Sequence, residues 1–447
     1  MAGKTKKQMA LGVTLVLVAA FSLVVPPVAS AAGEREQRSR SIRISKAEDF
    51  NPANGVRGGS GTKSDPFVIS GWDVSSVHIN DTDEYFVIRD NTIDNLTLNW
   101  NGHNRIRIVN NDIGDLRVNQ NVKRTGGPSS GVIANNTFGV VGQLRHFDGV
   151  FAHNTVGSPD DMMAKAPFFA NRAVNFDGFH GARFFDNVLY GYLEVRLHGH
   201  HHGSGYEAGS HYHGTPPKED EHAAHAEHAE MVDHTRRYHQ VHVSDNTIHA
   251  DGPYALIYTD SNHAANDRTN ASETNPELNK AHEHFTKIHI TNNKLVGSGL
   301  VVDIFNAKDE RHTKTNRGLM HIANNKITLS RSTSTLPLFE NRTGIQASRV
   351  VDLGLRIVGN TISYDAGSDP LAPAMSDQYF DTGILLQDVN LANVSIGNNS
   401  ISNVHYGVSA REMTETVEWS IWGLQTTGVA EPVWYDSSVK NQPRQTP

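Results

Sequence analysis

The chain has 447 residues, a formal net charge of −8 at pH 7 and no cysteine. Its length allows a sizeable hydrophobic core, but disulfides and cysteine-containing metal sites are excluded. The acidic balance argues against nucleic acid as a partner, because nucleic-acid binding relies on basic residues that neutralise phosphates.

Residues 1–31 have the pattern of a secretory signal peptide. Three lysines among the first seven residues precede an apolar run at residues 11–25 and the small-residue sequence ASA at residues 29–31. Cleavage after this sequence predicts a mature chain that begins near Ala32, keeps no stable membrane anchor, and is secreted or lies in the cell envelope. An uncleaved anchor is the alternative, although two prolines interrupt the run before it reaches the length needed to span a bilayer.

A short asparagine-containing pattern then recurs ten times, as in FVIRDNTID, IRIVNNDIG and VHVSDNTIH. Each copy has a short alternating strand, a polar or glycine corner residue, and an asparagine; these asparagines are Asn91, Asn111, Asn136, Asn154, Asn187, Asn246, Asn293, Asn325, Asn360 and Asn399. The tightest spacings are 20, 25 and 18 residues, which match one coil of a parallel β-solenoid. The pattern predicts an all-β protein, a right-handed parallel β-helix of about ten or more coils over residues 65–410, preceded by an N-terminal cap at residues 32–64.

Asparagine suits the corner of such a coil. It tolerates the left-handed conformation of a sharp turn, and stacked coils bring successive amides about 4.8 Å apart, so that they can hydrogen-bond as a ladder. Asp90, Asp186 and Asp245 directly precede a ladder asparagine, and we therefore interpret them as turn residues instead of catalytic acids.

A second strand pattern precedes the longest interruptions of the repeat. It is found in GYLEVRLH, ALIYTDSN, GLVVDIFN and GILLQDVN, which end at His198, Asn262, Asn306 and Asn390 when aligned by their first residues. A histidine-rich insert at residues 198–239 follows the first of these strands, and a second insert at residues 263–284 follows the next. A shorter insert follows Asn306, so the alignment predicts that all three leave the β-helix at one corner.

The histidine-rich insert contributes most of a cluster that places twelve of the 25 histidines between residues 198 and 242. Clustered neutral imidazoles bind zinc, copper or nickel with little demand on geometry. The predicted metal ligands in this insert are His198, His200, His201, His202, His211, His213, His222, His225, His228, His234 and His239. The alternative is a solvated insert whose histidines gain positive charge at acid pH.

Three further histidines each lie four residues before a ladder asparagine, in consecutive repeats. Aliphatic residues flank His242, His289 and His321, and strand alternation therefore directs these histidines outward. In a β-helix they form a vertical column in which two neighbouring nitrogens can reach one ion at about 2.0–2.1 Å. We predict a metal site that combines this column with the insert; outward strand positions that merely tolerate polar residues are the alternative.

The same outward position holds Arg107, Arg183 and Arg356 in other repeats, and a basic stripe on an acidic protein suits an anionic polysaccharide. Glycoside hydrolysis requires two carboxylates about 5–9 Å apart. The candidates, which do not share one register, are Asp148, Asp177, Asp260, Asp303 and Asp388. A polysaccharide lyase or glycoside hydrolase is therefore the less favoured alternative, with glycan contacts expected at Arg107, Arg183, Arg356, Asp260 and Asp303. A structural surface or adhesion module is a third possibility.

Residues 411–447 are expected to form a C-terminal cap, because an uncovered last coil would expose strand edges and core. The sequence VEWSIWGLQ supplies aromatic residues for this cover. The polar end, DSSVKNQPRQTP, predicts a disordered tail.

These motifs carry two resemblances. The ten asparagine motifs resemble the right-handed parallel β-helix repeats of pectate-lyase-like proteins. The opening NGVRGGSGTKSDPFVISGWDV, residues 54–74, resembles the start of secreted β-helix proteins related to the copper-accessory protein of nitrous oxide reductase. The first resemblance implies the fold. The second favours copper as the bound metal, although a fold alone does not carry function.

Together these features predict a secreted β-helix protein that binds zinc or copper for capture or delivery, without catalysis. The expected partners are the metal ion and either an acidic polysaccharide or a metal-receiving protein.

Overall fold

The computed structural model describes residues 36–37, 41–99, 106–119, 131–145, 147, 149–160, 172–178, 181–198, 236–251, 254–262, 283–306, 317–330, 343–350, 354–365, 381–389, 393–413 and 417–446. Contacts divide the chain into residues Met1–Arg35 and a unit from Glu36 to Pro447. The predicted signal peptide and most of the histidine-rich insert lie outside the described residues. In the described ranges, no helix is both long and apolar enough to cross a membrane.

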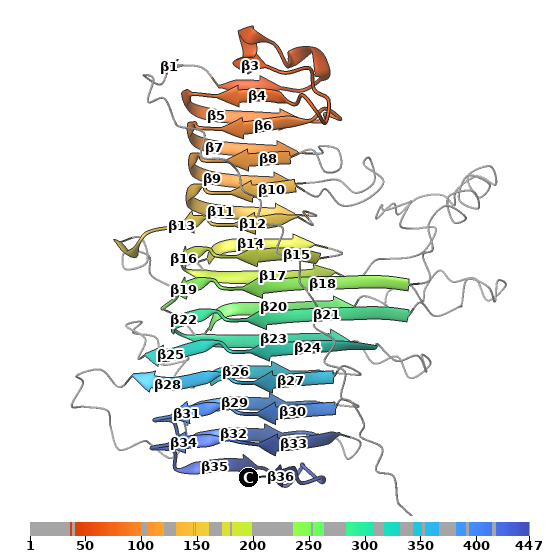
Figure 1. Cartoon of the computed structure of the whole chain (residues 1–447), viewed down its shortest axis with the longest axis vertical. Coiled ribbons are helices and arrows are strands. Elements are labelled where there is room, and N and C mark those ends of the chain that lie inside the picture. The colour runs from red at the N-terminus through yellow and green to blue at the C-terminus, as the bar shows by residue number, and fades with distance from the viewer. Residues whose placement is uncertain are drawn as a thin grey trace, which may run out of the picture. The chain divides into compact units, whose positions relative to one another are not determined.

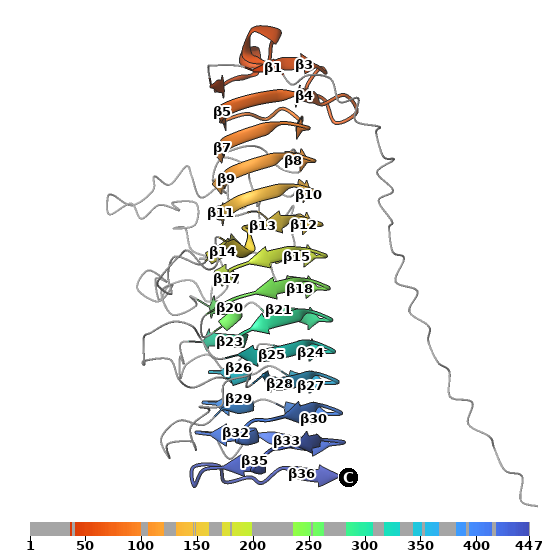
Figure 2. The same cartoon turned by 90° about the vertical axis from the view of Figure 1, so that its left-hand side faces the viewer.

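The unit from Glu36 onward is built from two large sheets (Figures 1 and 2). Sheet B has 14 strands: β3 (Val56–Gly58), β4 (Phe67–Ser70), β6 (Phe86–Arg89), β8 (Ile106–Val109), β10 (Gly131–Ala134), β12 (Val150–Ala152), β15 (Gly181–Phe185), β18 (Arg236–Ser244), β21 (Glu283–Thr291), β24 (Arg317–Ala323), β27 (Gly354–Val358), β30 (Asn393–Gly397), β33 (Glu418–Trp422) and β36 (Arg444–Thr446). Its strands pair in parallel, except that β3 is antiparallel to β4.

Sheet A has 22 strands: β1 (Glu36–Gln37), β2 (Ile42–Ile44), β5 (Trp72–Asn80), β7 (Thr92–Asn99), β9 (Asp112–Asn119), β11 (Thr137–Arg145), β13 (Thr155–Val156), β14 (Arg172–Gly178), β16 (Val188–Tyr190), β17 (Tyr192–His198), β19 (Thr247–His249), β20 (Tyr254–Asn262), β22 (Lys294–Gly297), β23 (Gly299–Asn306), β25 (Lys326–Ser330), β26 (Thr343–Ser348), β28 (Thr361–Asp365), β29 (Thr382–Gln387), β31 (Ser400–Ser402), β32 (Tyr406–Arg411), β34 (Gln425–Thr427) and β35 (Glu431–Tyr435). Two short 3₁₀ helices, η1 (Ala47–Asp49) and η2 (Pro52–Asn54), precede β3.

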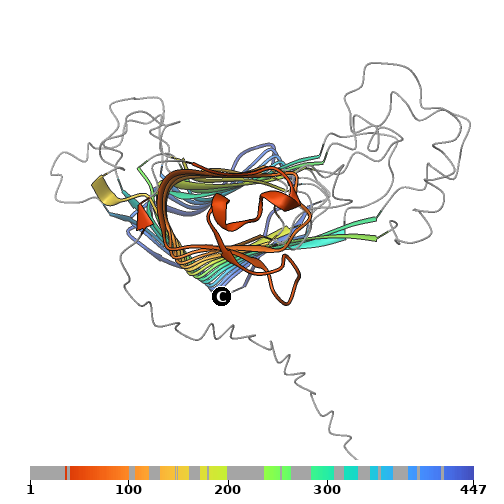
Figure 3. The same ribbon diagram turned by 90° about the horizontal axis from the view of Figure 1, so that it is seen from above.

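Each coil runs from a strand of sheet B through a corner into sheet A. From β13 onward the sheet A part of each coil is divided in two: β16 pairs with β13 and β19, whereas β17 pairs with β14 and β20. Seen from above, successive coils overlie one another (Figure 3). Inward side chains of consecutive coils, such as Val195, Tyr258 and Val302, are fully buried. The predicted parallel β-helix is confirmed.

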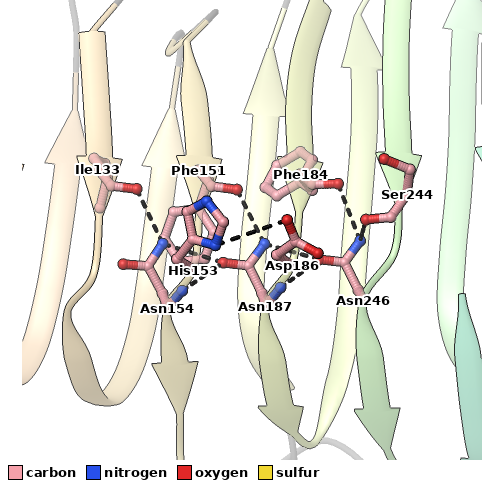
Figure 4. A network of polar contacts seen from close by, with 9 residues as sticks. All are labelled: Ile133, Phe151, His153, Asn154, Phe184, Asp186, Asn187, Ser244 and Asn246. Atoms are coloured by element: carbon pink, nitrogen blue, oxygen red, sulfur yellow. Dashed lines mark hydrogen bonds and ion pairs between the residues drawn. The ribbon is translucent and has the colours of Figure 1, made fainter. Parts of the chain in front are cut away.

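The predicted asparagine ladder is also confirmed (Figure 4). All ten asparagines are buried, and the side-chain amide of each of the first nine donates to the Oδ1 of the next. Asn187, for example, donates to Asn246 Oδ1 at 2.8 Å and to the Phe151 carbonyl at 3.0 Å. Because buried amides need partners, the ladder holds each coil in register with the next.

The left-handed residue at each corner is the one before the ladder asparagine, not the asparagine itself. Asp90, Asp186 and Asp245 have φ values of 58°, 53° and 59°, which confirms that they are turn residues. The asparagine keeps a non-left-handed backbone, and this conformation directs its amide inward to the ladder while the preceding residue turns the chain. At the two ends of the ladder Trp72 and Leu424 follow left-handed glycines in place of asparagine.

The two ends of the β-helix are closed differently. At the N-terminal end, Phe50 stacks on Phe67 with 4.5 Å between ring centroids, and the indole of Trp72 donates to the Gly55 carbonyl at 2.7 Å. At the C-terminal end the structure corrects the expectation of a disordered tail. Strand β36 pairs in parallel with β33, because the unpaired edge of β33 offers backbone partners that a polar sequence can use as well as an apolar one.

The three inserts leave and return at one corner. Strands β17, β20 and β23, which precede them, are consecutive neighbours, and so are β18, β21 and β24, which follow them. The predicted alignment was wrong by one residue at the first strand, because His198 pairs with Ser261 and not with Asn262. The alignment used Gly191 as the counterpart of Gly299, whereas Leu193 is level with Leu256 and Leu300, so Tyr192 is the residue level with Gly299.

Candidate functional site

The three predicted histidines form one column on the outer face of sheet B. His242 pairs with His289, and His289 pairs with His321, across three adjacent strands. The rings of His242 and His289 are stacked with centroids 4.9 Å apart and an interplanar angle of 8°, whereas His289 and His321 meet edge to face at 6.0 Å. The residues that flank each histidine are fully buried, so the histidines point outward as alternation predicts.

The column lies half-buried, and its environment favours neutral imidazoles. Burial lowers the pKa of His242, and the neighbouring His289 and Arg183 lower it further. Burial also lowers the pKa of His289, with a contribution from Lys287, and the pKa of His321, with contributions from Arg356 and His289. A neutral imidazole keeps a lone pair that is available to a metal ion.

This shift predicts a pH dependence of stability. Unfolding restores the ordinary histidine pKa of 6.5, so the unfolded chain binds protons more readily than the folded one, and stability is lost as the pH falls below that value. We expect the melting temperature of the wild type to fall more steeply between about pH 7.5 and about pH 5.5 than that of a His242→Gln/His289→Gln/His321→Gln variant. Equal slopes in the two proteins would show that the column does not contribute.

The column by itself is an incomplete metal site. Among the residues that the structure describes, no group of three or more His, Asp or Glu side chains is arranged to hold a metal ion. The Nε2 atom of His321 is nevertheless buried without a hydrogen-bond partner, and a metal ion between His289 and His321 would satisfy it. The stacked ring of His242 must rotate to direct a nitrogen at the same ion as its neighbour, so further ligands have to come from outside the column.

The sequence predicts that histidines of the insert act together with the column. His239 belongs to β18, three residues before His242, and His198 ends β17; their side chains are outside the described residues. The insert joins these two strands and returns at the start of β18, Arg236, which lies six residues before His242 on the same strand. The nine remaining predicted ligands, His200, His201, His202, His211, His213, His222, His225, His228 and His234, also lie outside the described residues.

The predicted glycan residues do not form one group. Arg183 pairs with His242 and Arg356 pairs with His321, so these two arginines are the immediate neighbours of the column. Arg107 shares the outward position but is separated from Arg183 by Val132 and Val150. The coils stack in the order of the repeats, so this order of side chains follows the chain.

The candidate carboxylates lie in different settings on sheet A. Asp303 accepts a hydrogen bond from Arg349 Nε at 2.7 Å, and it pairs with Thr259, one place from Asp260. Asp177 lies 4.0 Å from Arg145 Nε. Asp388 is a left-handed residue with φ of 51°, and Asp148 lies outside the described residues. The described carboxylates are therefore engaged in ion pairs or at a corner.

Glu194 is a buried charged residue that the sequence interpretation did not single out. Only 5% of the residue is exposed, and its carboxylate pairs with Arg196 on the same strand and with Arg172 Nη2 at 2.8 Å. Arg172 also donates to the hydroxyl of Tyr192 at 2.9 Å. The available signal was an acidic residue two places from an arginine within a strand that is otherwise mainly apolar.

No known protein-family model matches the chain, and no match was found among curated proteins or solved structures.

Proposed function

We propose that the protein captures or delivers a transition-metal ion, zinc or copper, at the histidine column, with further ligands from the histidine-rich insert. The observation that carries this proposal is the continuous pairing of His242, His289 and His321 on the strands that follow the three inserts. The column supplies rigid nitrogen donors, and the insert supplies the remaining ligands. When bound, the ion would satisfy the buried Nε2 of His321, which has no hydrogen-bond partner.

The chemistry of these donors suits the proposed metals. Imidazole binds zinc and copper well, and affinity among divalent ions rises toward copper. Metal binding requires neutral imidazoles, and burial lowers the pKa of all three column histidines. Of the candidate carboxylates, Asp303 and Asp177 face arginines and Asp388 lies at a turn, so the support for metal capture is stronger than the support for glycoside cleavage.

The remaining parts of the proposal rest on the sequence. The signal-peptide pattern supports a secreted or envelope location, and the repeat resemblance supports membership of the pectate-lyase-like superfamily. A metal-receiving protein is the partner that a delivery role requires.

Calorimetric titration of the mature protein with Zn²⁺ and Cu²⁺ at about pH 7.5 tests this function. We expect saturable binding that weakens by roughly 10-fold or more in a His242→Ala/His289→Ala/His321→Ala variant, because each lost nitrogen removes a ligand. A chain in which residues 199–235 are replaced by a short Gly/Ser linker is expected to lose affinity as well.

His153 provides a matched control. It is also an outward histidine of a neighbouring coil, but it lies at a corner, 3.7 Å from Asp186, and not in the column. A His153→Ala variant is expected to bind metal as the wild type does. Only millimolar affinity in the intact protein, or equal affinity in the wild type and the column variant, would contradict the proposal.

A further inference from the structure

Three cationic side chains lie around the histidine column. Arg183 is its neighbour at one end, Arg356 is its neighbour at the other, and Lys287 lies two residues before His289 on β21. Within the part of the chain that the structure describes, these three exposed side chains form no ion pair with a carboxylate. The absence is notable in a chain whose net charge is −8.

The arginines on the outer face of sheet A behave differently. Arg117 pairs with Asp115 at 2.8 Å, and Arg349 pairs with Asp303. Arginines that also pair with carboxylates on this face are Arg145, Arg172 and Arg196. These five arginines of sheet A thus have a carboxylate partner, whereas Arg183 and Arg356 beside the column have none among the described residues.

The positive charge around the column disfavours a bare divalent cation. Like charges repel, and a 2+ ion bound to the column would lie within one or two coils of two guanidinium groups, at a spacing of about 4.8 Å per coil. An anionic group has the opposite preference, because guanidinium binds carboxylates through paired, charge-assisted hydrogen bonds. The arrangement combines nitrogen donors in the middle with anion-binding groups at both ends.

We infer that the column takes its metal as an anionic chelate, in which the ion is coordinated by histidine nitrogens and a carboxylate of the chelator binds the arginine next to those histidines, Arg183 or Arg356. The inference rests on the proposed metal function and names the form in which the metal arrives. The order Arg183, His242, His289, His321, Arg356 places an anion-binding group directly next to the first and last donor. Arg183 and Arg356 are four strand spacings apart, about 19 Å, which is too far for one small polycarboxylate to bridge. An ion held by His289 and His321 lies about one and a half coils, roughly 7 Å, from the strand of Arg356, a distance that a free carboxylate of a bound chelator can cover.

The probe is copper(II) with radiolabelled citrate, whose complex is anionic, measured by equilibrium dialysis against the full mature chain. We expect citrate to be retained only when copper is present. An Arg183→Gln/Arg356→Gln variant is expected to retain at least about tenfold less citrate at equal copper, while its affinity for copper alone stays the same or rises because two repelling charges are removed.

Arg107→Gln is the matched control. Arg107 is an exposed, unpaired arginine at the same outward position, but Val132 and Val150 separate it from the column. Its loss is expected to leave citrate retention unchanged.

The dialysis separates failure of the chelate inference from failure of the metal function. Copper bound without citrate would overturn the chelate inference and leave the metal function standing. Citrate or polygalacturonate bound equally well without copper would overturn it in favour of a simple anion surface. If the chain bound copper in neither form, the metal function itself would fail.

Discussion

Replacing Asn246 with alanine is expected to lower the free energy of unfolding by about 3 to 5 kcal/mol. The Asn246 amide donates to Asn293 Oδ1 at 3.0 Å and to the Phe184 and Ser244 carbonyls. Its own Oδ1 accepts from the side chain and the backbone of Asn187. Removal leaves several groups without partners in a site of which only 1% is exposed, and buried unsatisfied groups each cost about 1–3 kcal/mol.

Urea unfolding followed by circular dichroism, together with the melting temperature, measures this loss. The control is Asn292→Asp, one residue earlier, at an exposed corner position with φ of 58° that aspartate also tolerates. We expect that variant to unfold within about 0.5 kcal/mol of the wild type. Equal losses at Asn292 and Asn246 would mean that the ladder contributes no more than a surface turn.

Replacing Gly299 with alanine is expected to cost about 3 kcal/mol, the upper range for an overpacked site. A Cβ atom at Gly299 would lie 1.9 Å from the Thr343 carbonyl oxygen and 2.5 Å from that of Gly344. Both atoms belong to the backbone of β26, so relief requires the strands to separate. The hydroxyl of Tyr254 also reaches across this coil to Gln346 at 2.9 Å, and separation of the strands would disturb that bond.

Gly354 gives a matched comparison, because a Cβ there meets no atom closer than Leu319 Cδ1 at 3.4 Å. Gly354→Ala is expected to be neutral or to stabilise by up to about 1 kcal/mol, since alanine restricts the unfolded chain. Thermal unfolding of both variants measures the difference in stability. A Gly299→Ala protein as stable as Gly354→Ala would show that the two strands tolerate a wider spacing.

Local patterns predicted much of the fold. The turn role of Asp186 follows from its position before an asparagine, and the outward direction of His289 follows from its two aliphatic neighbours. Both are properties of a few adjacent residues, and both are confirmed. The prediction of a disordered tail failed because it also used local composition alone. The composition of the polar C-terminal segment gives no sign of the edge of β33, with which β36 pairs.

Some contacts between coils were harder to predict from the sequence. The extra residue at Ala255 shifts β20 against its neighbour, and nothing within ALIYTDSN marks it as a bulge. The ion pairs of Glu194 depend on β14 lying beside β17. Arg183 and Arg356 share an outward position with Arg107, and because the coils stack in chain order the first two lie against the histidines.

The sequence by itself determined the coil, the ladder and the direction of each side chain, because a two-residue alternation and one turn residue per coil are local features. The tertiary structure alone decided the register of β17 against β20 and the ion pairs between coils, because inserts of unequal length separate neighbouring coils. Asn187 and Asn246 are 59 residues apart in the chain, yet they share a hydrogen bond of 2.8 Å. The same stacking, set by backbone pairing and not by sequence distance, brings two arginines to the ends of the histidine column.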